Sequence, residues 1–245
     1  MTFTSDVLHG RHALVTGGTQ GIGAAVARQL AGMGATVVAA GLPPKGGWQR
    51  DQPGGEADLA LAELDVSDEA SVRRLFAGLR RLDIVVNCAG IIQRGAEHEL
   101  DVFERVIAVN LTGTMRVCAA ARPLLARQGG CIVNLASMLS FFGGSLVPGY
   151  SASKGGIAQL TKSLALAYAA EGIRVNAVAP GWIATPLTQA LQEDEQRSRD
   201  LLKRTPLGRW GQPEDVAQVA AFLCTPAASF MTGTIVPVDG GYLAA

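Results

Sequence analysis

Two clusters of residues, far apart in the chain, have the types and the spacing that chemistry needs. The first is the run T-G-G-T-Q-G-I-G at residues 16–23, which directly follows the apolar residues 13–15. The second is the pair Tyr150 and Lys154, with Ser137 thirteen positions upstream. A glycine-rich loop after an apolar strand is typical of dinucleotide binding, and a tyrosine beside a lysine can transfer a proton. Together the clusters predict hydride chemistry on a carbonyl or an alcohol.

The spacing of Tyr150 and Lys154 places both side chains on one face of a helix. A free phenol has a pKa near 10, so its use near pH 7 requires a stabilisation of the phenolate by about 4 kcal/mol. An ammonium about 4 Å away, in an effective dielectric of about 20, supplies about 4 kcal/mol. We therefore expect Lys154 to make Tyr150 a competent general acid and base.

Two further polar residues fit this proton-transfer pair. Ser137 follows the apolar strand 131–136, so its hydroxyl is expected at the carboxyl edge of the sheet, where a substrate oxygen would lie. Asn110 lies in an apolar helical stretch, and a buried asparagine needs partners, of which a water relay is one. Each of these features alone also has a structural interpretation. Tyr150 and Lys154 could be a chance pair, Ser137 could simply start a loop, and Asn110 could bridge neighbouring strands. Their joint placement favours catalysis.

The glycine loop suits the phosphates of a dinucleotide. Gly17, Gly21 and Gly23 let the backbone turn tightly and let a pyrophosphate approach, and the free N–H groups of the following helix then meet the anion. The spacing is G-x-x-x-G-x-G rather than G-x-G-x-x-G, and a plain glycine-rich turn is the alternative. Its place as the first turn between strand and helix favours the nucleotide.

The adenosine end of the expected site carries fewer signals. Residues 40–41 hold neither an acid for a ribose hydroxyl nor a base for a 2′-phosphate, and Gln20 stands where an arginine could meet that phosphate. Lys45 and Arg50 could reach it, but they lie in an irregular segment. The sequence therefore favours NAD over NADP. Asp65 could accept from the adenine amino group or simply begin a turn.

Short apolar runs alternate with helical patterns along the whole chain, which predicts one α/β domain over residues 1–245. The expected strands are 12–16, 35–40, 60–65, 83–87, 130–136, 173–179 and 233–238. The expected helices are 21–32, 68–80, 101–127, 150–171, 187–203 and 213–225. Apolar strands followed by helices predict a doubly wound parallel sheet covered on both faces. Residues 41–55 contain too many prolines and glycines for a crossover helix and are expected to form a loop.

Composition excludes several classes of function. The 245 residues contain 21 basic and 21 acidic side chains, so no overall field favours nucleic acid or membranes. The apolar stretches are too short to cross a bilayer, and the N-terminus does not read as a signal peptide, so a cytoplasmic location is expected. Four scattered cysteines suggest a reducing compartment, and the three histidines form no metal-ligand spacing, so no metal is expected.

At this point the chain resembles the short-chain dehydrogenases/reductases over nearly its whole length. The motifs that carry the resemblance are T-G-G-T-Q-G-I-G at 16–23, Asp65-Val66, N-C-A-G at 87–90, Asn110, Ser137, Tyr150-x-x-x-Lys154, Pro180-Gly181 and the ending at 238–242. The resemblance implies a Rossmann-like fold with a seven-stranded sheet. It also implies an NAD(P)-dependent oxidoreductase that assembles as a dimer or tetramer. Cys88 replaces an asparagine that is common in the second motif.

The same resemblance assigns roles to individual residues. Tyr150 would be the general acid and base, Lys154 would lower its pKa and bind the nicotinamide ribose, Ser137 would orient the substrate oxygen, and Asn110 would hold a relay water. The residues expected to bind the cofactor are Gly17, Thr19, Gln20, Gly21, Ile22, Gly23, Asp65, Val66, Asn87, Ala89, Gly90, Pro180, Gly181, Ile183 and Thr185.

Within this family, four stretches are similar to the 2-keto-3-deoxygluconate (2-deoxygluconate) dehydrogenases: 136–144, 91–94, 194–198 and 208–211. That similarity implies a sugar-acid substrate. Arg94 could then bind the substrate carboxylate, and Trp182 could cap the substrate, although a solvated arginine and a packed tryptophan are the alternatives. Two other functions stay open, a 3-oxoacyl carrier-protein reductase and a dinucleotide-binding regulator without turnover. Apolar faces on 101–127 and 150–171 are candidates for self-association.

Overall fold

A single parallel sheet organises the molecule. The computed structural model describes residues 4–43 and 59–245, and within them the sheet has seven strands in the order β3-β2-β1-β4-β5-β6-β7. In chain order the strands are β1 (His12–Thr16), β2 (Thr36–Gly41), β3 (Leu59–Glu63), β4 (Ile84–Asn87), β5 (Cys131–Leu135), β6 (Arg174–Pro180) and β7 (Ile235–Val238). The strand order reverses between β1 and β4, which is where ligands bind in doubly wound sheets.

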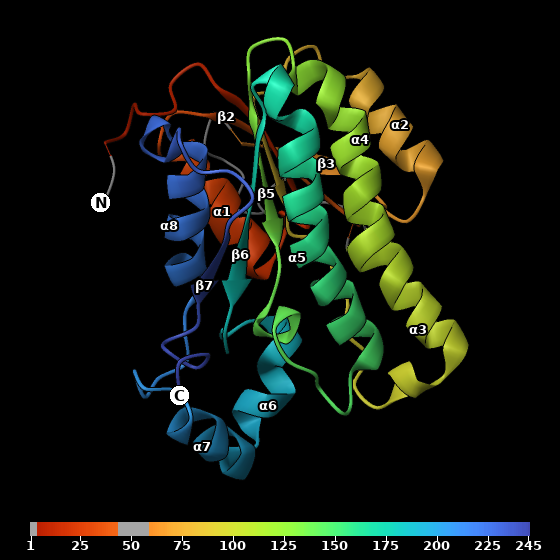
Figure 1. Ribbon diagram of the computed structural model, residues 1–245, viewed down its shortest axis with the longest axis vertical. Coiled ribbons are helices and arrows are strands. Elements are labelled where there is room, and N and C mark those ends of the chain that lie inside the picture. Colours follow the sequence, from red (N-terminus) through yellow and green to blue (C-terminus); the bar gives the residue numbers. More distant parts are fainter. Residues whose placement is uncertain (1–3, 44–58) are drawn as a thin grey trace.

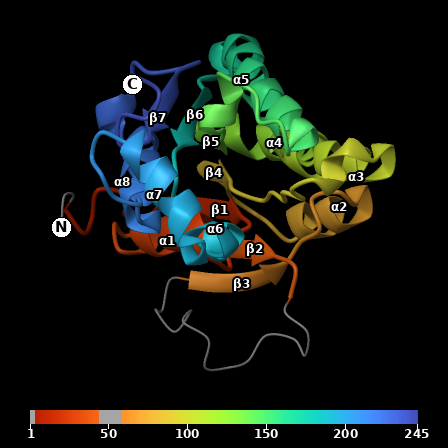
Figure 2. The same cartoon turned by 90° about the horizontal axis from the view of Figure 1, so that it is seen from below.

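Helices cover both faces of the sheet. They are α1 (Gly21–Ala31), α2 (Glu69–Ala77), η1 (Ala96–His98), α3 (Leu100–Ile107), η2 (Ala108–Gly113), α4 (Thr114–Leu125), η3 (Met138–Ser140), α5 (Pro148–Tyr168), η4 (Ala169–Glu171), η5 (Pro186–Thr188), α6 (Gln189–Glu193), α7 (Glu195–Lys203), α8 (Pro213–Cys224) and η6 (Pro226–Ala228). Helices α1 and α8 pack on one face, while α2, α4 and α5 pack on the other (Figures 1 and 2). Among the described helices, none is long and apolar enough to cross a membrane.

The structure confirms the expected doubly wound sheet and subdivides two of the expected helices. The stretch 101–127 consists of α3, a π-helical turn η2, and α4, and the irregular turn carries Asn110. The stretch 187–203 divides at Asp194, whose extended backbone ends α6 and whose carboxylate accepts the N–H of Arg197 to begin α7. Hydrophobic periodicity runs through both breaks and therefore could not reveal them. Of the segment 41–55, residues 44–55 lie outside the described residues.

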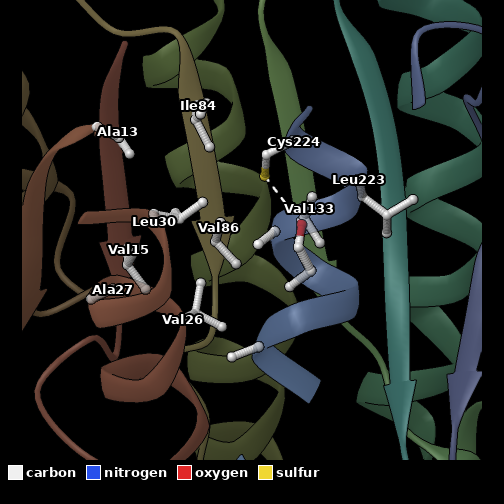
Figure 3. Packing of buried hydrophobic residues seen from close by; sticks show 14 of the residues in the cluster. Ala13, Val15, Val26, Ala27, Leu30, Ile84, Val86, Val133, Leu223 and Cys224 are labelled. Atoms are coloured by element: carbon white, nitrogen blue, oxygen red, sulfur yellow. Dashed lines mark hydrogen bonds between the residues drawn. The ribbon is translucent and has the colours of Figure 1, made fainter. Parts of the chain in front are cut away.

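The core consists of two apolar layers on either side of the strands. In the layer between the sheet and the helices α1 and α8, Leu30 and Leu223 meet Val15, Val86 and Val133 (Figure 3). All five side chains are fully buried. The other layer joins the sheet to α2, α4 and α5. Burial on both faces explains why the strands read as continuous apolar runs instead of alternating patterns.

A buried carboxylate ties the beginnings of β1 and β4 together. Asp83 accepts the backbone N–H of His12 at 2.9 Å, and the guanidinium groups of Arg81 and Arg11 bind it at 2.9 and 3.1 Å. Burial by itself raises the pKa of Asp83, but the hydrogen bonds from Arg81, His12 and Arg11 outweigh it and hold that pKa below the ordinary value. The ionised carboxylate therefore stabilises the fold.

We expect Asp83→Asn to lower the free energy of unfolding at neutral pH by about 1–3 kcal/mol, because the amide loses charge-assisted hydrogen bonds. Since the folded-state pKa is lowered, the contribution of Asp83 is fully present above the ordinary aspartate pKa and is lost as the pH falls through the folded-state value. Urea denaturation at several pH values measures this difference, with the exposed Asp6→Asn as the control. A difference that stayed constant into acid would contradict this account.

Candidate active site

The loops that follow β1 and β4 meet at the carboxyl edge of the sheet, because the two strands are paired in register. Thr16 at the end of β1 lies opposite Asn87 at the end of β4. The backbone N–H of Cys88 then donates to the carbonyl oxygen of Thr16 at 3.0 Å. The glycine loop at 17–23 therefore begins beside the segment 88–91, although about seventy residues separate the two in sequence.

Backbone crowding explains the glycines of the first loop. Gly17 has a φ of +61°, and a Cβ atom there would lie 2.8 Å from the backbone of Ala89. A Cβ atom at Gly23 would lie 2.2 Å from the carbonyl oxygen of Gly17. Helix α1 begins at Gly21, and its N-cap Gln20 makes no side-chain hydrogen bond to the first turn. The N–H groups of that turn are therefore available to an anion.

A cavity of about 320 Å³ lies over this loop. Seven of the residues predicted to bind the cofactor line it, namely Gly17, Gln20, Gly21, Ile22, Gly23, Gly90 and Thr185. Cys88, Leu135, Pro186 and Leu187 also line it and were not predicted. Their only sequence signal is that they adjoin predicted residues. A glycine cradle, free helix N–H groups and an adjoining cavity fit the pyrophosphate of a dinucleotide.

Other residues predicted for the cofactor have different contacts in the structure. Asp65 accepts the N–H and the hydroxyl of Ser67 at 2.8 and 2.6 Å, which is the turn-forming alternative. Val66 is buried, and its carbonyl oxygen accepts from Arg116. The Thr19 side chain lies against Gly41, at the end of β2. Their roles toward an adenosine stay predictions, and Lys45 and Arg50 lie outside the described residues.

The remaining residues predicted for the cofactor mostly support the backbone around the cavity. The Asn87 amide is buried and donates to Asn134 at 2.9 Å. The N–H of Ala89 donates to the Thr16 hydroxyl at 3.3 Å. Pro180 ends β6, the following Gly181 packs against Asp239, and Ile183 is buried beside Gly211. Any direct contact of these residues with a cofactor stays a prediction.

The predicted proton-transfer residues come together where β5 ends beside α5. The Ser137 side chain lowers the pKa of the Tyr150 phenol, and its hydroxyl accepts the N–H of Leu139 at 3.2 Å. The Lys154 ammonium lies 5.4 Å from the centre of the Tyr150 ring. It is buried and donates to the carbonyl oxygen of Leu135 at 2.5 Å. Leu135 also lines the cavity over the glycine loop, so this proton-transfer group and that cavity adjoin.

Burial and neighbouring charges set the ionisation of this group. Burial raises the pKa of the Tyr150 phenol, the Ser137 hydrogen bond and the Arg94 charge lower it, and the Glu97 carboxylate raises it. On balance the phenol pKa lies above its ordinary value. Burial also lowers the pKa of Lys154 to about 8. That Lys154 brings the phenol pKa down, with help from the positive nicotinamide, stays a prediction.

Asn110 connects the π-helical turn to the loop after β4. Its amide oxygen accepts the N–H of Ile91 at 2.8 Å, and its amide nitrogen donates to the carbonyl oxygen of Ile91 at 2.9 Å and to the Ser153 hydroxyl at 3.1 Å. The residue is buried beside Gly90 and close to Lys154. These bonds fix the loop that lines the cavity, and the relay role of Asn110 stays a prediction.

Arg94 and Trp182 share a second cavity of about 400 Å³ at the carboxyl edge. The guanidinium of Arg94 lies 6.0 Å from the centre of the Trp182 ring. Helix α7, which lies beyond the carboxyl ends of the strands (Figure 1), adds Arg197 and Leu201, and the C-terminal segment adds Tyr242. Three arginines, Arg94, Arg197 and Arg204, outnumber the one acidic residue, Asp200, in a largely apolar lining, which suits an organic anion of modest size.

Comparison with known proteins agrees with this geometry. A family model described as Enoyl-(Acyl carrier protein) reductase matches residues 17–243. A protein of Bacillus subtilis (strain 168), named 2-dehydro-3-deoxy-D-gluconate 5-dehydrogenase, is 42% identical over 245 residues, with 96% of each chain covered. Cis-4-hydroxycyclohexanecarboxylate dehydrogenase of Sinomonas cyclohexanicum is 45% identical over 254 residues, with 96% of this chain and 97% of the relative covered.

A solved structure resembles the fold as a whole. A protein of Agrobacterium tumefaciens, provisionally assigned as a 2-deoxy-D-gluconate 3-dehydrogenase and crystallised with NADP, superposes with a TM-score of 0.88 at 43% identity, covering 97% of this chain and 98% of that one. The match extends over the sheet, the glycine loop and the tyrosine–lysine helix alike. This chain therefore belongs to the short-chain dehydrogenases/reductases, a family of NAD(P)-dependent oxidoreductases.

Proposed function

We propose that this enzyme interconverts a secondary alcohol and a ketone on a sugar acid or a related hydroxy acid, with Tyr150 as the general acid and base. The observation that carries the proposal is the group formed by the half-buried Tyr150 with the buried Ser137 and Lys154, beside the cavity over the glycine loop. A bound nicotinamide would exchange a hydride with the substrate carbon. We assign the accompanying proton to the phenol oxygen of Tyr150.

Each polar side chain of this group has a separate task in the proposal. The Ser137 hydroxyl orients the substrate oxygen, and the same side chain lowers the pKa of the phenol. The Lys154 ammonium favours the phenolate and binds the nicotinamide ribose, with its position fixed by the carbonyl of Leu135. Asn110 keeps the loop after β4 in place through Ile91. A proton can thus be exchanged at a phenol whose neighbours are held in place.

For the cofactor we propose that the glycine loop and the start of α1 hold the pyrophosphate, with Gly90 and Thr185 also lining the cavity. The sequence favours NAD because residues 40–41 offer no base for a 2′-phosphate, whereas the similar Agrobacterium structure contains NADP. The ratio of kcat/KM for the two cofactors decides between them. A preference for NADPH would overturn the expectation from the sequence.

The substrate class follows from chemistry that two relatives share. One is named for a deoxygluconate and the other for a hydroxycyclohexanecarboxylate, and both compounds carry a carboxylate and an oxidisable ring or chain carbon. Arg94 would pair with such a carboxylate, because it lies in the second cavity and also acts electrostatically on Tyr150. A 3-oxoacyl carrier-protein reductase is the second candidate, since the matching family model is described as a carrier-protein reductase.

We also propose that the chain forms one domain over 1–245 and assembles as a dimer or tetramer. The helix α5 has Leu166 exposed at 84%, and α4 has Met115 exposed at 37%, which suits an apolar interface along these helices. The cytoplasmic location stays a prediction, and the free thiols of all four cysteines suit a reducing compartment.

We expect Tyr150→Phe to reduce turnover by about 10²–10⁴-fold, because the proton then has no positioned carrier. Cofactor binding, followed by nicotinamide fluorescence, is expected to persist. The matched control is Tyr168→Phe, the same change in the same helix, where the ring packs beside Arg122 away from the site. Near-normal turnover by Tyr150→Phe in nicotinamide absorbance assays would reject the assigned acid and base.

We expect Arg94→Gln to raise KM for a sugar acid by about 10–100-fold, because a charge-assisted bond contributes about 1.5–3 kcal/mol. KM for an uncharged secondary alcohol is expected to change little. Removal of this cation also takes away an influence that lowers the pKa of Tyr150, so the pH midpoint of kcat is expected to rise. Arg105→Gln, an exposed change on α3, is the control.

Assays with sugar acids, uncharged alcohols and acyl-thioester ketones separate the two candidate functions. Turnover of acyl-thioester ketones, with sugar acids inert, would favour the carrier-protein reductase. Equal losses for charged and uncharged substrates in Arg94→Gln would contradict a carboxylate contact.

We expect sedimentation at micromolar concentration to give the mass of a dimer or tetramer, with Leu166→Glu shifting the distribution toward monomer because a charge would be buried at the interface. Glu replacement at the exposed Leu42, which follows β2 and lies on neither helix, serves as the control. A wild-type chain that sediments only as a monomer would contradict the proposed assembly.

A further inference from the structure

A buried carboxylate outside the proton-transfer group contacts the backbone of Tyr150 directly. Glu97, in the short helix η1, is 1% exposed. One carboxylate oxygen accepts the N–H of Tyr150 at 2.7 Å, and the other accepts the N–H of Gln93 at 2.8 Å. Gln93 immediately precedes Arg94, so one side chain joins the helix of the phenol to the segment of the arginine.

This contact supplies what α5 lacks at its own beginning. Tyr150 is the third residue of the helix, where a backbone N–H has no partner within the helix. The N-cap residue Val147 makes no side-chain hydrogen bond, and the first turn contains no acidic residue. The Glu97 carboxylate therefore acts as a cap from another element, and its negative charge suits the positive end of the helix.

The carboxylate is closely packed on the side of Gly149. A Cβ atom at Gly149 would lie 3.3 Å from the Glu97 oxygen that binds Tyr150 and 3.2 Å from the ring of Phe103. In Figure 1 the start of α5 lies beside the segment that leads into α3. The carboxylate thus has little freedom, and the two N–H groups that it binds are held at a fixed separation.

Glu97 also belongs to the set of charges that act on the phenol. Around Tyr150 these groups are Arg94 after β4, Glu97 in η1, the Ser137 hydroxyl after β5, and Lys154 in α5. The Glu97 carboxylate raises the phenol pKa, whereas Arg94 lowers it. Glu97 therefore influences Tyr150 in two ways. Its hydrogen bond positions the backbone of Tyr150, and its charge raises the pKa of the phenol.

We propose that Glu97 is a positioning residue, whose buried carboxylate fixes the phenol of Tyr150 relative to the substrate arginine Arg94 by binding the backbone of both segments. The proposal rests on the proposed function of Tyr150. It predicts that the length and the charge of the Glu97 side chain affect the reaction in different ways.

Two variants separate reach from charge. Glu97→Asp keeps the charge but is one methylene shorter, so it cannot reach both N–H groups. We expect its kcat to fall about tenfold with a pH midpoint close to the wild type. Glu97→Gln keeps the length but loses the charge and one acceptor. We expect a similar fall in kcat and a pH midpoint that moves to lower pH, because a charge that opposes phenolate has gone.

The control is Glu99→Gln, an exposed acid two residues away whose side chain makes no cap hydrogen bond, and we expect it to match the wild type. Thermal melting and cofactor fluorescence accompany the kinetics. The proposal would be overturned if the two Glu97 variants showed the same loss of kcat and the same loss of melting temperature, and the pH midpoint of Glu97→Gln did not move. Failure of both variants to fold would overturn it too, since the carboxylate would then serve the fold alone.

An ultraviolet titration of the phenols provides a readout without turnover. The chain has three tyrosines, and subtraction of the Tyr150→Phe titration isolates Tyr150. We expect the Tyr150 midpoint to fall in Glu97→Gln and to stay in Glu99→Gln. A wild type inactive on every alcohol and ketone would reject the proposed function, while the titration would still test Glu97. An unchanged midpoint in an active enzyme would reject only the role of Glu97.

Discussion

The active-site edge of this enzyme depends on a buried ammonium held by a backbone carbonyl. Lys154 is almost completely shielded from solvent, and a buried cation is tolerated only with a good partner. The carbonyl of Leu135 is that partner, at 2.5 Å. Because Leu135 ends β5 and Lys154 lies on α5, this one bond fixes the helix against the edge of the sheet. The phenol one turn earlier on the helix is placed by the same bond.

The glycine loop obeys a second constraint, which comes from crowding of the backbone. The loops after β1 and β4 approach so closely that Gly17 has no room for a Cβ atom beside Ala89. The reversal of strand order at this point leaves a cavity above the two loops, with the N-terminus of α1 directed toward it. A phosphate site and a proton-transfer site therefore adjoin because parallel strands end at one edge.

The charges near Tyr150 oppose one another. Burial and Glu97 favour the neutral phenol, whereas Ser137 and Arg94 favour the phenolate. A general acid and base works best when neither form is strongly preferred at the working pH. An arrangement of opposed influences makes the phenol responsive to a bound substrate anion, which would neutralise Arg94, and to a cationic nicotinamide. In the proposed mechanism, substrate and cofactor would both influence the proton on Tyr150.

Residue types and spacing predicted much of this arrangement. Continuous apolar strands required a sheet covered on both faces, and Tyr150 and Lys154 at a separation of four had to share a helical face. The glycine loop and the family resemblance together predicted seven of the residues that line the cavity. These features are local, or they follow from chain order, and so they can be read without coordinates.

Contacts between distant segments could not be read in this way. Nothing in the sequence distinguishes Glu97 from the exposed Glu99, because burial depends on where η1 packs against α5. The π-helical turn at Asn110 and the turn role of Asp65 depend likewise on neighbours that only the folded chain supplies. The sequence by itself determined the sheet and predicted the cofactor loop and the acid–base pair. Only the tertiary structure decided which charges face the phenol, because electrostatic influence follows distance in space and not separation along the chain.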